Sequence, residues 1–158
     1  MDEVTDESTI GRALYAYDPA TDVFTLIKDI TGNVADAGIS HFTMLGADLY
    51  FEALGALWKT DGTAACTVAV AVTDTVSVRG VNNLFAWNGK LFFEGDAGAD
   101  DQLWVYDPVA HTVTNVSNIT GDTGSNANNH DPSDYEALDG FLYYSDEVSD
   151  NTSKYLFR

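Results

Sequence analysis

One short phrase occurs three times in this chain of 158 residues. Residues 14–21 read LYAYDPAT, residues 57–64 read LWKTDGTA and residues 103–110 read LWVYDPVA. The phrases begin at positions 14, 57 and 103, so they start 43 and 46 residues apart. A recurrence at this spacing indicates an array of supersecondary units that must stack, because one unit alone cannot bury its apolar face. We therefore expect a repeat array rather than one irregular domain.

Each unit is predicted to contain four antiparallel β-strands. The chain has no long segment with helical apolar spacing, whereas short alternating and aromatic runs recur between Gly, Asn and Asp clusters. The first two strands of each unit form a hairpin, because Asn88-Gly89 and Asp139-Gly140 favour tight type I′ turns. The first strands are predicted at 41–45, 83–87 and 134–138, and the second at 49–51, 91–93 and 142–144. The recurring phrase forms the third strand, and the fourth strands are predicted at 23–27, 66–72 and 112–116.

Four antiparallel strands in 40 to 50 residues, with one aromatic motif per unit, are typical of a propeller blade. Residues 57–64 resemble the ELWxxDGTxxGT repeats of large secreted bacterial proteins, and 14–26 and 103–116 resemble a kelch-like phrase. The chain departs from the first pattern at Ala56 and Cys66, where Glu and Gly are usual, and it lacks the kelch double glycine. The resemblance implies a β-propeller that occurs in extracellular binding proteins, and it implies no catalytic residue.

The phase of the repeat sets the expected organisation of the array. Asp2-Glu3-Val4-Thr5-Asp6 matches Asp146-Glu147-Val148-Ser149-Asp150, 144 residues later, which is three units averaging 48 residues. The prediction is a single array over 1–158, with repeats at 12–53, 54–97 and 98–148 and the start of a further repeat at 149–158. About three blades are too few to close a propeller. The chain is therefore expected to be part of a longer propeller or to pair with a second copy, and a three-unit prism or sandwich is the remaining alternative.

Charge and composition restrict the possible partners. With 25 acidic and 7 basic residues the net charge is −18, which repels nucleic acid and suits divalent cations, basic partners or a salty medium. No apolar run is long enough to span a bilayer, and no signal peptide is visible. The single cysteine, Cys66, excludes an internal disulfide and is expected to be a small buried residue.

Acidic loops after the second strands are the candidate metal sites. Ca²⁺ takes oxygen ligands from flexible Asp-, Asn- and Gly-rich loops, although such loops are also simply solvated turns. No EF-hand series is present. The candidate calcium ligands are Asp96, Asp100, Asp101, Asp146, Glu147 and Asp150.

Evidence for catalysis is weak. Glu52, Glu94 and Glu136 are candidates for the carboxylate pair of a glycosidase, but their spacing does not require that chemistry. His41, His111 and His130 lie in different repeats without metal-binding spacing. The expected function is a non-enzymatic extracellular or cell-surface module that self-associates to complete a propeller, with glycan or protein as possible ligands. A carbohydrate-binding or carbohydrate-active propeller with acidic rim loops is the alternative.

Overall fold

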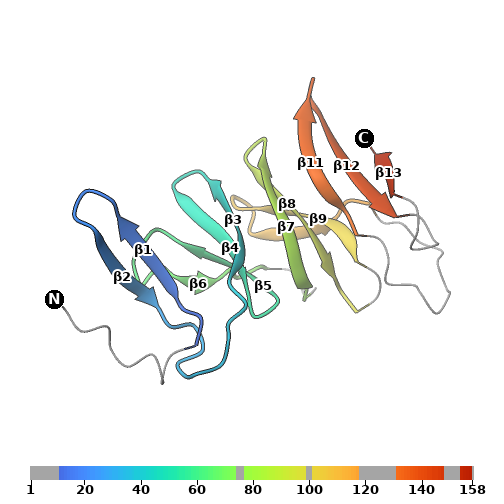
Figure 1. Cartoon of the computed structure of the whole chain (residues 1–158). Coiled ribbons are helices and arrows are strands. Elements are labelled where there is room, and N and C mark those ends of the chain that lie inside the picture. Colours follow the sequence, from blue (N-terminus) through green and yellow to red (C-terminus); the bar gives the residue numbers. More distant parts are fainter. Residues whose placement is uncertain (1–10, 74–76, 99–100, 118–130, 148–153, 158) are drawn as a thin grey trace.

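The computed structural model describes residues 11–73, 77–98, 101–117, 131–147 and 154–157, and in that part the chain is all-β and antiparallel (Figure 1). The strands of the first half are β1 (Leu14–Asp18), β2 (Val23–Lys28), β3 (Ser40–Leu45), β4 (Asp48–Ala53), β5 (Ala56–Thr60) and β6 (Val68–Ala69). Those of the second half are β7 (Arg79–Trp87), β8 (Lys90–Asp96), β9 (Gln102–Asp107), β10 (Thr112–Asn115), β11 (Ser133–Leu138), β12 (Phe141–Glu147) and β13 (Lys154–Phe157). The predicted all-β class is confirmed.

The strands form four sheets in chain order. The first is the β1–β2 hairpin, the second has the order β3-β4-β5-β6, the third has the order β10-β9-β8-β7 and the fourth has the order β11-β12-β13. Figure 1 shows the sheets side by side in a row, with the β1–β2 hairpin and the fourth sheet at opposite ends of the row. Strand β7 contacts both β3 and β11, so the first strands of successive sheets are neighbours.

Tight turns connect the first and second strands where the sequence predicts them. Asn88 and Gly89 have φ values of 49° and 75°, and Asp139 and Gly140 have values of 51° and 81°. Both residues of a type I′ turn need positive φ, which Asn, Asp and Gly adopt more readily than other residues do. These two hairpins are therefore determined by local sequence.

The hydrophobic core lies between successive sheets. Strand side chains alternate between the two faces, so an apolar second strand can pack on both of its neighbours. Tyr50 of β4 packs with Phe93 and Tyr106 of the third sheet, whereas Phe51 packs with Leu14 of the first sheet. Leu103 of β9 packs with Leu142 and Tyr144 of β12 on the other side of the third sheet. The recurring aromatic residues thus connect one sheet to the next.

Three sheets share one register between the second and third strands. Phe51 lies opposite Trp58, Phe93 opposite Trp104 and Tyr144 opposite Phe157. By this register, β1 corresponds to β5 and β9, because Leu14-Tyr15 stands where Leu57-Trp58 and Leu103-Trp104 stand. The repeated phrase thus forms the third strand of the second and third sheets, whereas its first copy forms β1, which pairs with β2 in the described part of the chain.

Two details differ from the sequence-based expectation. The fourth strand predicted at 66–72 is only two residues long, and Cys66 is exposed rather than buried. Cys66 ends a turn in which its backbone N–H donates to Thr63 Oγ1 at 3.2 Å. The buried residue is the next one, Thr67, whose hydroxyl is 2.7 Å from that of Thr60. Because of this polar turn, the side chain that faces the interior is that of Thr67 rather than that of Cys66.

Candidate functional site

The predicted calcium ligands are dispersed over strands and loops. Asp96 ends β8, while Asp146 and Glu147 lie inside β12 rather than in the predicted loop, and Asp146 is fully buried. Asp146 stands where Gly95 and Ala53 stand in the other sheets, which explains why its side chain is inside. Asp100 and Asp150, with the side chain of Glu147, lie outside the described residues. The assignment of calcium to this set stays a prediction.

A different acidic group does come together. Glu94 of β8, Asp101 immediately before β9 and Asp131 shortly before β11 place carboxylate oxygens within 4.8 Å of one another. Glu94 is buried and accepts a hydrogen bond from Asn83 Nδ2 at 2.7 Å. Asp101 is the one predicted calcium ligand in this group. With one oxygen from each, three carboxylates supply fewer than the six to eight oxygens of calcium, so second carboxylate oxygens, backbone oxygens or water would have to complete such a site.

Two tyrosines lie close to this acidic region. Burial raises the pKa of Tyr135 strongly, and the negative charges of Glu94 and Asp146 raise it further. Burial also raises the pKa of Tyr144, again with a contribution from Asp146. The Tyr135 hydroxyl donates to the carbonyl oxygen of Pro132 at 2.6 Å. Burial therefore favours the neutral, protonated form of both phenols.

Each first strand contains a β-bulge at the same place. Residues 41 and 42 lie opposite Phe51, residues 83 and 84 opposite Phe93, and residues 134 and 135 opposite Tyr144. The first residue of each bulge has positive φ: 54° at His41, 48° at Asn83 and 56° at Asp134. Bulges redirect side chains and are common next to functional sites, where strained backbone is retained.

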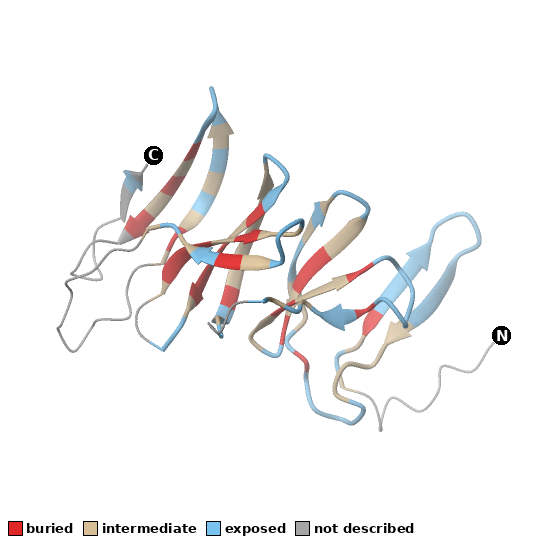
Figure 2. Ribbon diagram, turned by 180° about the vertical axis from the view of Figure 1, so that it is seen from behind, coloured by how far each residue is buried: buried red, intermediate tan, exposed pale blue. Residues whose placement is uncertain are grey.

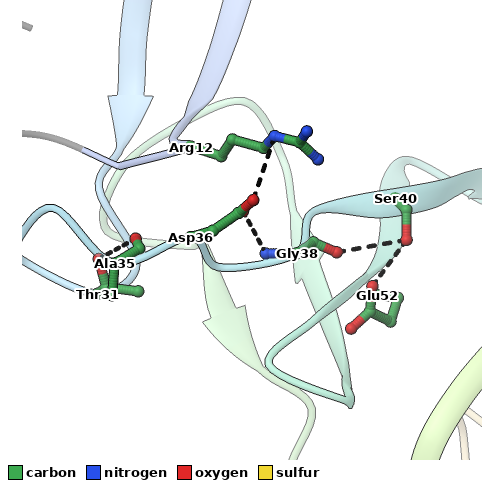
Figure 3. Close-up of polar contacts among 7 residues, drawn as sticks. All are labelled: Arg12, Thr31, Ala35, Asp36, Gly38, Ser40 and Glu52. Carbon is green, nitrogen blue, oxygen red and sulfur yellow. Dashed lines mark hydrogen bonds and ion pairs between the residues drawn. The ribbon is translucent and has the colours of Figure 1, made fainter.

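A polar residue of the second strand supports each bulge. Ser40 donates to Glu52 Oε2 at 2.7 Å, as Figure 3 shows, and Asn83 donates to Glu94 Oε2 at 2.7 Å. In the fourth sheet Ser145 donates to Asp134 Oδ2 at 3.0 Å. By the shared register Glu52, Glu94 and Ser145 are equivalent positions. Glu52 and Glu94 thus have equivalent places in two different sheets, while Glu136 lies on a first strand, β11.

The three bulges line one groove of about 340 Å³. Its walls come from β3, β7 and β11, the neighbouring first strands of three sheets. The polar lining residues are the first residue of each bulge and Thr43 of β3. The apolar lining includes one aromatic ring from each strand. The lining residues are His41, Phe42, Thr43, Asn83, Leu84, Phe85, Asp134 and Tyr135.

Sequence reasoning did not single out this groove. Its signal was present, since each predicted first strand begins with a polar residue followed by an apolar one: His41-Phe42, Asn83-Leu84 and Asp134-Tyr135. The polar residue alone gives no indication of a bulge, because the extra residue shows only when the first strand is paired with the second. The predicted ligand site was therefore placed in the acidic loops and not in the groove.

An exposed apolar face is the second unusual surface. In the β1–β2 hairpin, Tyr15 pairs with Leu26 and Tyr17 with Phe24, so these four side chains share one face. Phe24 is 71% exposed and the two tyrosines are each 50% exposed. The equivalents of the tyrosines on β9, Trp104 and Tyr106, are 5% and 2% exposed because the preceding sheet covers them. Figure 2 shows the contrast between the mostly exposed hairpin and the buried stripes of the next sheets.

Comparison with protein-family models, with curated proteins and with solved structures finds no match for this chain. Within the described ranges there is no helix long and apolar enough to cross a membrane. The features of the chain that bear on function are therefore the repeated sheets, the exposed hairpin face and the groove.

Proposed function

We propose that this chain is a non-enzymatic interaction module whose sheets act as blades of a β-propeller, and that it associates with a second copy through the β1–β2 hairpin. The observation that carries the proposal is the exposed face of Tyr15, Tyr17, Phe24 and Leu26. The same face is covered in the third sheet, where Trp104 and Tyr106 pack toward Tyr50 of the preceding sheet. We therefore infer that another β-sheet covers the apolar face of the hairpin in the assembled protein.

The fourth sheet of a second copy offers the matching edge. In the second and third sheets the third strand pairs along the second strand over five residue pairs. On β12, strand β13 covers four pairs, from Tyr144 to Glu147. If β1 of a second copy replaced β13 along β12 in the shared register, Tyr15 would stand opposite Tyr144 and β2 would supply a fourth strand. Two chains joined in this way at both ends would complete six blades.

The net charge and the resemblance to known repeats bear on where the protein acts and on how two copies associate. The resemblance to repeats of secreted bacterial proteins supports an extracellular or cell-surface location. A net charge of −18 opposes association of two copies at low salt, so the apolar face must supply the attraction. The proposed role is therefore structural: blades stack through aromatic side chains, and assembly covers apolar surface that one chain leaves exposed.

Sedimentation analysis of the 158-residue chain over a wide concentration range tests this proposal. We expect a reversible dimer whose dissociation constant rises about tenfold or more in Phe24→Ser, because one well-buried aromatic side chain contributes about 1.4 kcal/mol or more to association. Val109→Ser is the matched control, since Val109 is 88% exposed in the turn between β9 and β10. A chain that stays monomeric up to about 300 µM, far above a micromolar dissociation constant, would refute self-association.

A further inference from the structure

We propose that the groove between β3, β7 and β11 binds a neutral saccharide, with His41, Asn83 and Asp134 as the residues that contact its hydroxyl groups. This inference does not depend on self-association, because all lining residues come from one chain. It also differs from the acidic-loop hypothesis, because the residues lie on the first strands of three sheets.

The backbone geometry is the first argument. Three residues at equivalent places keep positive φ although none of them is glycine. His, Asn and Asp are the non-glycine residues that adopt this conformation most often, but it remains unfavourable relative to glycine. If the bulge served only to bend the strand, glycine would fit best at all three places. Three different polar residues at these places line one groove, which indicates that their side chains are used.

The hydrogen-bonding atoms are the second argument. His41 Nδ1 is 2.9 Å from the Ser40 hydroxyl, which leaves Nε2 available. Asn83 donates its Nδ2 to Glu94, so its Oδ1 remains an acceptor, and Asp134 accepts from Ser145 through Oδ2, which leaves Oδ1. Among the residues that the structure describes, none hydrogen-bonds to these three remaining atoms. Each of these side chains thus makes a hydrogen bond through one atom, while its second polar atom has no hydrogen bond from the described part of the chain.

The aromatic lining is the third argument. Phe42, Phe85 and Tyr135 line the groove, one from each of the three strands. Phe42 is half exposed, and Phe85 and Tyr135 contact one another at a centroid distance of 6.1 Å. The C–H face of a sugar ring packs on such apolar surface, while its hydroxyls, which donate and accept at once, meet acceptors and an imidazole nitrogen. Pockets that combine apolar walls with a few fixed polar groups are typical of small-ligand sites.

A neutral ligand fits better than a cation. Among the described residues, Asp134 is the one carboxylate that lines the groove. Glu52 and Glu94 lie behind the bulges, where their carboxylates accept from Ser40 and Asn83. Amide and imidazole groups discriminate between hydroxyl arrangements and add no charge attraction. The groove is also open along three strands, which suits an oligosaccharide chain better than a compact ion.

Titration calorimetry of the 158-residue chain with soluble neutral oligosaccharides, namely cello-, xylo-, manno- and chito-oligomers, tests the proposal. We expect at least one of them to bind, and His41→Gly, Asn83→Gly and Asp134→Gly each to weaken binding about tenfold, as the loss of one hydrogen-bonding group does. Glycine is chosen because it tolerates positive φ and so removes the side chain without straining the backbone.

The chain supplies a matched control for each variant. His111, Asn88 and Asp139 are the same residue types, have φ values of 57°, 49° and 51°, and do not line the groove. Their glycine variants should bind as the parent chain does. The proposal is overturned if none of the saccharides binds, if the groove variants bind like the controls, or if a lysine-rich peptide binds in the groove while every saccharide fails.

Discussion

At the scale of single residues, the polar positions of this chain act through backbone geometry and burial more than through charge. His41, Asn83 and Asp134 occupy bulges, and the partly buried Tyr135 lies directly beside one of them. The acidic side chains, which outnumber the basic ones 25 to 7, make short local contacts instead. Asp18 and Asp61, for example, accept hydrogen bonds from the turns that follow them, which lowers the pKa of both carboxyl groups.

Tyr135 should make the free energy of unfolding depend on pH in the alkaline range. Its pKa is raised in the folded chain, chiefly by burial, so above about pH 10 the unfolded chain loses the phenolic proton before the folded chain does. The free energy of unfolding should therefore fall as pH rises beyond that value. Tyr135→Phe should reduce this fall, although it lowers stability by about 1 kcal/mol at neutral pH through the lost bond to Pro132.

Urea unfolding at several pH values between about 8 and 11 measures this effect. Tyr15→Phe serves as a control, because Tyr15 is half exposed. An equal decline with pH in the parent chain and in Tyr135→Phe would show that Tyr135 does not control alkaline stability.

At the scale of strands and sheets, equivalent positions tolerate different side chains because neighbouring segments differ. Ala53, Gly95 and Asp146 are equivalent by register, and each is buried. At Gly95 a Cβ atom would lie 2.5 Å from Val78 Cγ1 and 3.1 Å from the Arg79 carbonyl oxygen. The Gly95 carbonyl oxygen also accepts a hydrogen bond from Trp104 Nε1 at 2.8 Å. Close packing of the 78–79 segment, rather than backbone conformation, explains glycine here.

Gly95→Ala should therefore destabilise the chain by about 1–3 kcal/mol, the usual effect of overpacking. The nearest atom belongs to Val78, so Val78→Ala in the same chain should restore part of the loss even though Val78→Ala alone is destabilising. Thermal unfolding of the two single variants and the double variant measures the coupling. Strictly additive losses would contradict this explanation.

The elements also show what sequence can and cannot predict. The hairpins at Asn88-Gly89 and Asp139-Gly140 and the repeated third strands were predicted because two to eight adjacent residues determine them. The bulges at His41, Asn83 and Asp134 were not, because a bulge is a mismatch between two strands. The acidic group of Glu94, Asp101 and Asp131 was missed for a similar reason, since it joins a residue of β8 to residues that precede β9 and β11.

At the scale of the whole molecule, apolar packing between sheets and repulsion between carboxylates have opposite effects on stability. Successive sheets are held together by apolar and aromatic contacts, as in the cluster that joins Tyr50 to Tyr106. Against this, 25 acidic residues and 7 basic ones give a net charge of −18 on a chain whose described ion pairs are few and partly or fully exposed. Exposed ion pairs contribute little, so repulsion between carboxylates is hardly offset locally.

Salt should therefore stabilise this protein. Raising NaCl from about 20 mM to about 500 mM shortens the screening length from about 20 Å to about 4 Å and weakens the repulsion between carboxylates. We expect the melting temperature to rise by several degrees, which corresponds to about 1 kcal/mol or more in a chain of this size. The dissociation constant of the proposed dimer should fall over the same range, because like charges on the two copies are screened. Differential scanning calorimetry and sedimentation in parallel measure both changes.

Since burial of the hairpin face is apolar, Phe24→Ser should lose association at every salt concentration while keeping the salt-dependent rise in melting temperature. A melting temperature that falls with added NaCl would show that attractive charge pairs, and not carboxylate repulsion, dominate the electrostatics of the fold.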